Sequence, residues 1–246
     1  MQFIEELEGS SKEGRLQALR EIVDAGEYGS DRFPVTQEVN NHVHTHYSFS
    51  PYSPAHAAFQ AASAGLQAVG SVDHDSIAAA DELRRAAEIL GIGGTAGYEL
   101  RVNFDGTAVE GHILNNPDSA NIGYIVIHGV PASATEKVRR FHGPINEARN
   151  RRNRVQLEAL NAILEGYDIA PLDFMRDVVP LTMAHQGGAI TERHILYALS
   201  RRLIELFGKG ESLLRELRRR FDLDPSGAVV EYLADSENPH YAYDLL

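Results

Sequence analysis

The stretch Asn40–Pro54, NNHVHTHYSFSPYSP, governs the interpretation of the whole chain. Its first residues, together with Val39, have the apolar and β-branched content of a short strand over 39–43. His42 and His44 are two residues apart, so a strand would point both imidazoles to one side. Two such imidazoles before a loop rich in serine and proline form half of a site for a first-row metal ion. A purification tag, a surface strand or core histidines bonded to the backbone would give the same pattern, so the pair alone does not establish a metal site.

The next segments alternate in the way that parallel sheets require. Residues 54–64 have helix-forming composition, and residues 66–72, LQAVGSV, form a buried-strand candidate that leads into the acidic turn 73–75, DHD. A further amphipathic helix is predicted to begin at Ser76, which would cap it. Strands alternating with helices predict a parallel sheet, whose sites lie at the carboxyl ends of its strands. His44 and the 73–75 turn both lie at such ends.

Three further strand candidates each carry an ionisable residue: 95–102 with Glu99, 107–114 with His112, and 122–128 with His128. The Asp105-Gly106 pair between the first two is a hairpin turn signal. We therefore expect these two strands to pair antiparallel, with Glu99 and His112 as close cross-strand neighbours.

The composition excludes several classes of protein. The 246 residues contain no cysteine, so any metal must be bound by His, Asp or Glu. No window approaches the roughly 18 apolar residues of a membrane span. The acidic N-terminus lacks the apolar segment of a signal peptide, so we expect a cytoplasmic protein without a membrane partner. A net charge of −12 argues against indiscriminate nucleic-acid binding. Phosphate-binding glycine motifs of nucleotide sites are not indicated either.

The chain divides into three predicted parts. Residues 1–35 are interpreted as an N-terminal helical extension, and 36–130 as the metal-binding α/β core. Residues 131–246 are interpreted as a helical insertion or lid, because 134–165 and 191–220 are charged and helical in composition.

Five motifs together resemble the PHP (polymerase and histidinol phosphatase) family of metal-dependent phosphoesterases. They are HVHTHYS, SPYSP, AGLQAVGSVDHDSIAAADEL, GYE and GHIL, and they span about residues 38–115. The later segments RNRRNRVQLEALN and GGAITERHILYAL are similar to the helical insertion of the nucleotide-phosphoesterase branch. The resemblance implies a distorted (β/α) barrel with two or three Mn, Zn, Fe or Mg ions.

The resemblance also implies roles for individual residues. His42 and His44 would bind one metal ion, His74 a second, and Glu99 would bridge the ions, with His112 serving the same cluster. Asp73 and Asp75 would orient the ligands and set the histidine tautomers. Glu99 and Asp73 are thus the two residues implicated in catalysis.

Other residues are left with two interpretations. Arg154, Arg193 and His194 are interpreted as substrate-binding residues, because the similar branch places such residues near the phosphate. The surrounding basic cluster is equally well explained as a solvated helix face. His128 and His185 are metal ligands on one interpretation and histidines of local structure on the other.

The chain departs from the family pattern in two places. Ser50 offers only a hydroxyl where many members have an acidic residue or histidine for the second metal, and no D-x-H motif follows. The strand candidates are too few to close a barrel, so we expect an incomplete barrel. A partner segment or a second copy of the chain would then cover the open strand edges.

These observations predict a metal-dependent phosphoric-ester hydrolase that uses metal-activated water. Its substrate would be a small phosphorylated metabolite, a nucleotide or an oligonucleotide end. The alternative is a non-catalytic or incomplete PHP module, whose partial metal site serves structure or partner binding. An exonuclease module attached to nucleic-acid machinery is a third hypothesis, which the acidic composition disfavours.

Overall fold

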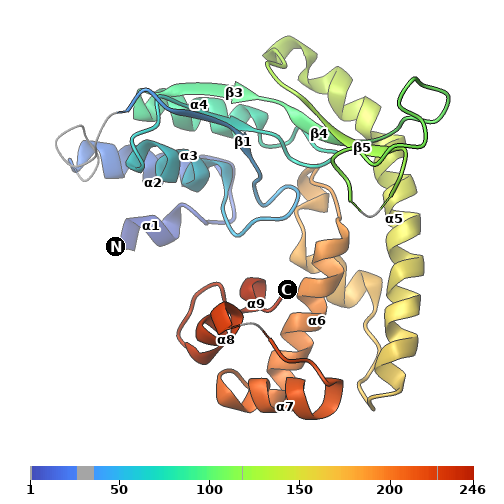
Figure 1. Ribbon diagram of the computed structural model, residues 1–246. Coiled ribbons are helices and arrows are strands. Elements are labelled where there is room, and N and C mark those ends of the chain that lie inside the picture. Colours follow the sequence, from blue (N-terminus) through green and yellow to red (C-terminus); the bar gives the residue numbers. More distant parts are fainter. Residues whose placement is uncertain (1, 27–35, 118, 226) are drawn as a thin grey trace. The chain divides into compact units, whose positions relative to one another are not determined.

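The structure is a computed structural model that describes residues 2–26, 36–117, 119–225 and 227–246 (Figure 1). The strands are β1 (Val39–Val43), β2 (Ala68–Ser71), β3 (Gly93–Ala96), β4 (Tyr98–Asn103) and β5 (Ile122–Ile127). The α-helices are α1 (Gln2–Glu6), α2 (Lys12–Asp24), α3 (Pro54–Ser63), α4 (Ala80–Leu90), α5 (Thr135–Glu165), α6 (Glu192–Phe207), α7 (Glu211–Phe221), α8 (Gly227–Ala234) and α9 (Tyr241–Asp244). The short helical turns are η1 (Ala132–Ala134), η2 (Phe174–Val178), η3 (Val179–Leu181) and η4 (Ala184–Gln186).

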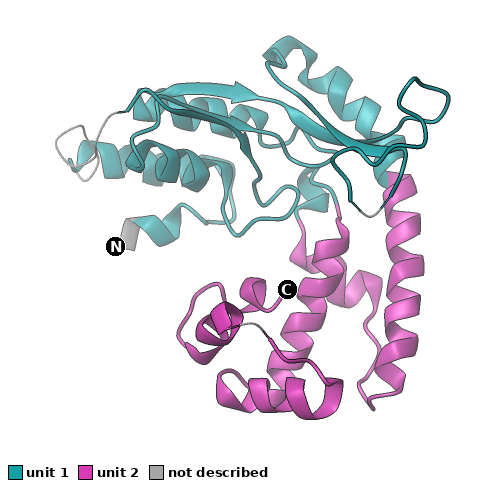
Figure 2. Cartoon of the chain, viewed as in Figure 1, with its two compact units in different colours: residues 1–146, 183–189 teal, residues 147–182, 190–246 magenta. Residues whose placement is uncertain are grey.

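The chain forms two compact units (Figure 2). Unit 1 comprises Met1–Asn146 and Met183–Ala189, and unit 2 comprises Glu147–Thr182 and Ile190–Leu246. The long helix α5 therefore begins in unit 1 and continues in unit 2. The divisions predicted after residues 35 and 130 stay predictions.

The predicted parallel sheet is confirmed in unit 1. Strands β1, β2 and β3 pair in parallel in the order β1-β2-β3, and β1 occupies the predicted residues 39–43. The helices α3 and α4 connect successive strands that are also neighbours in space. Because crossovers of this kind are right-handed, both helices lie on the same face of the sheet, where they pack against each other (Figure 1).

The core of unit 1 lies on this helical face. Leu16 of α2, Ala58 of α3 and Leu83 of α4 are fully buried in one apolar cluster. Beside it, Arg15 of α2 forms a two-pronged ion pair with Glu82 of α4, with nitrogen–oxygen distances of 2.8 and 2.6 Å. The side chains are 1% and 0% exposed, so each charge depends on the other for compensation.

Helix α4 begins three residues later than expected, with Ala79 as its N-cap. Ser76 was predicted as its N-cap, but the first helical residue is Ala80. The Ser76 hydroxyl instead accepts a bond from the Ala78 amide and donates to the Gly187 carbonyl of the same unit, at 3.1 and 2.8 Å. It therefore stabilises the turn that precedes the helix.

The predicted strand 95–102 is divided into β3 and β4 at Gly97. A side chain at Gly97 would collide with the Ile127 carbonyl, so only glycine allows β5 to approach this closely. After Gly97 the chain leaves the parallel sheet, and β4 forms a separate antiparallel pair with β5. This break positions Glu99, the second residue of β4, beside the parallel sheet.

The prediction that 107–114 is a strand is wrong. Asp105-Gly106 does form a turn, but the following residues continue in successive turns, and Gly111 has a φ of +84°. The antiparallel partner of β4 is β5, and Glu99 pairs with Val126. The expected pairing of Glu99 with His112 is therefore wrong as well.

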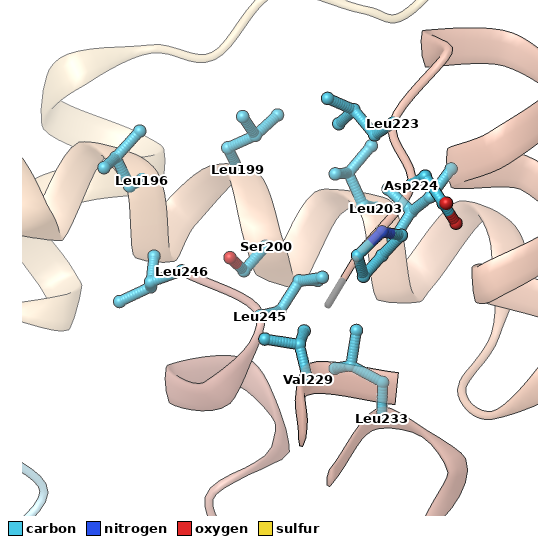
Figure 3. A pocket seen from close by; sticks show the side chains of 12 residues that line it. Leu196, Leu199, Ser200, Leu203, Leu223, Asp224, Val229, Leu233, Leu245 and Leu246 are labelled. Carbon is cyan, nitrogen blue, oxygen red and sulfur yellow. The ribbon is translucent and has the colours of Figure 1, made fainter. Parts of the chain in front are cut away.

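Unit 2 is helical and contains an apolar cavity of about 330 Å³ (Figure 3). Leu203 of α6, Leu217 of α7, Leu233 of α8 and Leu245 are among the residues that line it. The helices predicted within 134–165 and 191–220 are confirmed as α5, α6 and α7. None of the described helices combines the length and apolar character needed to cross a bilayer.

Candidate metal centre

Three histidines converge on one carboxylate in unit 1. The Nε2 atoms of His42 and His44 lie 3.7 and 3.3 Å from Glu99 Oε2, and His74 Nδ1 lies 3.2 Å from the same oxygen. His42 is on β1 and His44 follows its end, whereas His74 follows β2. The carboxyl ends of two parallel strands therefore meet the start of β4, as the strand-and-turn pattern predicted.

The backbone fixes Glu99 opposite His74. The two residues form a parallel β-bridge. The Glu99 amide donates to the Asp73 carbonyl at 3.1 Å, and the Asp75 amide donates to the Glu99 carbonyl at 3.0 Å. Asp75 adopts a positive φ of 48°, which turns the chain away immediately after this bridge. The side-chain amide of Asn146, on α5, donates to the Asp75 carbonyl at 3.0 Å and stabilises this turn.

Asp73 organises the loop that follows His44. Its carboxylate accepts bonds from the Thr45 amide and hydroxyl at 2.6 and 2.7 Å, and from the Ser48 hydroxyl at 2.7 Å. Asp73 is 1% exposed, and burial raises the pKa of its carboxyl group, although these three hydrogen bonds oppose the rise. The carboxylate thus joins the end of β2 to the loop after β1.

The orientation of His44 follows from this loop. Ser48 Oγ lies 3.4 Å from His44 Nδ1, on the side of the ring opposite the nitrogen that faces Glu99. The His44 ring also stacks on the His74 ring, with centroids 4.6 Å apart, and lies 5.3 Å from the His42 ring. Rings held in this way present their nitrogens without further rearrangement.

The electrostatics of the group suit a cation. Burial alone would raise the pKa of Glu99, but the hydrogen bond from His44 and the charges of the three histidines outweigh it and lower the pKa. Among the described residues, His42, His44 and Glu99 form the group whose ligand atoms all lie within 4.8 Å of one another. One carboxylate oxygen shared by imidazole nitrogens is a donor set typical of first-row metal ions.

The remaining candidate ligands lie apart from this group. His112 and His128 are exposed, and His112 Nδ1 is 3.1 Å from the Glu110 carbonyl. His185 is exposed in η4, where its ring contacts the Gln186 amide at 3.0 Å. The structure brings none of the three into the His42–His44–Glu99 group within the part of the chain it describes.

The three predicted substrate-binding residues all belong to unit 2. Arg154 is exposed on α5, and its guanidinium stacks over Phe174 at 4.2 Å. Arg193 is exposed on α6. His194 is 3% exposed and accepts a bond from the Thr191 amide at 3.0 Å, which caps α6; burial lowers its pKa to about 4. Their role toward a substrate stays a prediction.

The sequence interpretation missed Tyr124, which lies beside the centre, and the buried His142, which packs against Tyr98. Tyr124 of β5 lies beside the cluster, with its ring centroid 5.8 Å from that of His74. His142 of α5 is buried against Tyr98, and neither of its ring nitrogens has a hydrogen-bond partner in the described structure. Burial lowers the pKa of His142, although Asp75 opposes the shift. Only the tertiary fold reveals these neighbours, because both residues are distant from the motifs in sequence.

Comparisons with known proteins give a likeness of fold. No protein-family model and no curated protein matches the chain. A candidate metal-dependent phosphoesterase from Bifidobacterium adolescentis is similar with a TM-score of 0.50 and 19% identity, over 78% of this chain and 58% of that one. An amidohydrolase from Chromobacterium violaceum, solved with sulfate and no metal, is similar with a TM-score of 0.50 and 20% identity, over 75% of this chain and 55% of that one. The chain thus spans little more than half the length of both.

Proposed function

We propose that this protein is a metal-dependent hydrolase of phosphate esters, in which His42, His44 and Glu99 hold one metal ion and His74, on the same Glu99 oxygen, serves a second. One observation carries the proposal: three imidazole nitrogens lie within 3.7 Å of the same Glu99 oxygen. Without a cation, so compact a group would have little structural purpose, because Glu99 could be satisfied by one partner. A divalent ion supplies Lewis acidity, which lowers the pKa of water and neutralises phosphoryl charge.

The protein's own residues would perform three tasks in this reaction. Glu99 would supply the negative charge that retains the metal at the carboxyl ends of β1 and β2. Asp73 would keep His44 in place through Ser48, whose hydroxyl touches both residues. The exposed side of the group would admit the substrate, since the side chain of His42 is 52% exposed, whereas that of Glu99 is 10% exposed.

The parallel sheet of unit 1 supports a fold related to (β/α) barrels. Helices α3 and α4 cover one face of the parallel sheet, which is the arrangement of (β/α) barrels and differs from doubly wound sheets. We propose that unit 1 is the front part of a distorted barrel of the PHP type. The two similar structures, a candidate phosphoesterase and an amidohydrolase, are compatible with this assignment.

A non-catalytic metal-binding module is the second candidate. One observation favours it: Ser50, where an additional ligand is expected, accepts a bond from the Tyr52 amide at 3.2 Å and serves its own loop. A site with fewer ligands would still bind metal and could stabilise the fold or a partner complex.

Hydrolysis of p-nitrophenyl phosphate in the presence of Mn²⁺ tests the proposal. Wild-type protein is compared with Glu99→Gln and with Glu88→Gln, a matched change at an exposed glutamate on α4. We expect equal activity in wild type and Glu88→Gln, and none in Glu99→Gln. Full activity in Glu99→Gln would refute the assignment. A wild-type protein that binds metal but hydrolyses no phosphate ester in a broad panel would favour the non-catalytic module.

A further inference from the structure

The register of the β4–β5 pair places two further polar residues beside the metal centre. Glu99 and Arg101 are two residues apart on β4, so they lie on the same face of the ribbon. Arg101 pairs directly with Tyr124 of β5, and residues directly opposite each other share a face. Arg101 and Tyr124 therefore belong to the face that carries Glu99, whereas Leu100 belongs to the opposite face.

The position of Tyr124 confirms this assignment of faces independently. Its ring contacts the His74 ring at a centroid distance of 5.8 Å. Its backbone is held by the side chain of Asn115, which accepts from the Tyr124 amide and donates to the Tyr124 carbonyl, each at 2.8 Å. Tyr124 thus lies at one side of the candidate centre, and Arg101 lies opposite it in the β4–β5 pair.

Arg101 has no counter-charge in the described structure. Its side chain is half-buried, yet no carboxylate among the described residues lies within ion-pair distance of its guanidinium. This is unlike Arg15, Arg85 and Arg149 in the same chain, each of which has an acidic partner. An arginine that is partly removed from water, without an acid, favours binding of an external anion.

We propose that Arg101, flanked by Tyr124, is the residue that recognises the anionic group of the substrate. Two strand positions separate Arg101 from Glu99 by about 7 Å along the backbone, a span that the long arginine side chain can bridge. The planar guanidinium matches two non-bridging oxygens of a phosphate and donates charge-assisted hydrogen bonds to them. A bound anion would also relieve the repulsion between Arg101 and cations held by the histidines.

This inference rests on the proposed function and makes it more specific. The two similar structures differ in the chemistry their descriptions give, a phosphate ester in one and an amide in the other. A neutral amide would leave the Arg101 charge uncompensated, whereas a phosphate monoester would satisfy it. Arg101 therefore selects a small substrate with an exposed phosphate dianion over an uncharged one.

Binding of inorganic phosphate to the Mn²⁺-loaded protein tests the inference without requiring turnover. Titration calorimetry is performed on wild type, on Arg101→Gln, and on Arg20→Gln as the matched control at an exposed arginine of α2. We expect Arg101→Gln to weaken phosphate binding about 10- to 100-fold, the usual effect of losing a hydrogen bond between charged groups. Arg20→Gln should bind like wild type. Metal equivalents per chain should be equal in all three proteins.

The outcomes separate this inference from the proposed function. Weaker phosphate binding in Arg101→Gln supports the inference even if no ester is hydrolysed, in which case only the catalytic proposal fails. Wild-type affinity in Arg101→Gln, or no phosphate binding by the loaded wild type at millimolar concentration, would overturn the inference. If Arg101→Gln does not fold, Arg101→Met keeps the aliphatic part of the side chain and is held to the same criteria.

Discussion

Replacing Asp73 should destabilise the protein more than replacing an exposed acidic residue, because Asp73 holds the loop that presents His44. The carboxylate accepts three bonds, two from Thr45 and one from Ser48, at 2.6 to 2.7 Å. Thr45 and Ser48 are both 0% exposed, so water cannot replace the lost acceptor. Asp73→Ala would leave three donors unsatisfied in the interior.

The magnitude follows from the individual bonds. Each buried donor left without a partner costs about 1–3 kcal/mol, and removing the buried charge recovers part of this cost. We therefore expect Asp73→Ala to lower the free energy of unfolding by roughly 3–5 kcal/mol. Asp73→Asn keeps one acceptor oxygen, and its amide can donate to the Thr45 hydroxyl, so it should cost about 1 kcal/mol.

Urea unfolding measures the free energy of unfolding, and hydrogen exchange on peptides covering residues 42–48 measures the stability of the loop itself. Asp81→Ala is the control, because the Asp81 side chain is 58% exposed and its ion pair with Lys12 is worth about 1 kcal/mol or less. Equal free energies of unfolding for Asp73→Ala and Asp81→Ala, or amide exchange over 42–48 that Asp73→Ala leaves unchanged, would show that Asp73 does not hold this loop.

Three further predictions concern stability. Arg15→Met should lower the free energy of unfolding in urea by about 3–5 kcal/mol, because it leaves the Glu82 carboxylate buried without a partner. The double variant Arg15→Met, Glu82→Leu should lose much less, and equal losses would contradict the interdependence of the buried pair. Protonation of His194 favours the unfolded state, because its pKa in the folded protein is about 4, below the ordinary 6.5. The contribution of neutral His194 to the free energy of unfolding should be complete above pH 6.5 and lost as the pH falls toward 4. A His194→Gln variant that loses the same stability over this pH range would count against this. Gly97→Ala should destabilise the protein by about 1–3 kcal/mol, because the new methyl group would collide with the Ile127 carbonyl. Gly143→Ala is the control, since its methyl group would meet no atom within 4 Å, and it should be neutral or stabilising in thermal melts. Equal melting temperatures of the two variants would argue against the close approach of β5 to Gly97.

Sequence patterns predicted the local elements that form the candidate metal centre. Strand β1 occupies the residues expected from its β-branched content, because alternation and a following turn are local properties. The acidic turn 73–75 follows β2 as expected, and parallel pairing brings it beside His44. The spacing of the motifs was therefore enough to predict the arrangement of those elements that follow one another in sequence and are also neighbours in space.

The partner of β4 could not be predicted in the same way. The segments 107–114 and 122–127 both have strand-like residues, and the Asp105-Gly106 turn favoured the nearer one. Pairing depends on long-range competition: the apolar run of β5 forms six consecutive pairs with β4, whereas Gly111 turns the intervening segment. Arg101 and Tyr124 were missed for this reason, because their proximity exists only in that register.

Elemental analysis of the purified protein tests whether His42, His44, His74 and Glu99 bind metal. The protein is prepared without chelator or metal-affinity resin, and Mn, Fe and Zn are measured per chain in wild type, His44→Ala and Glu99→Gln. We expect at least one metal equivalent per chain in wild type and a large loss of metal in both variants. A metal content that is negligible in wild type after reconstitution, or unchanged in the variants, would contradict it.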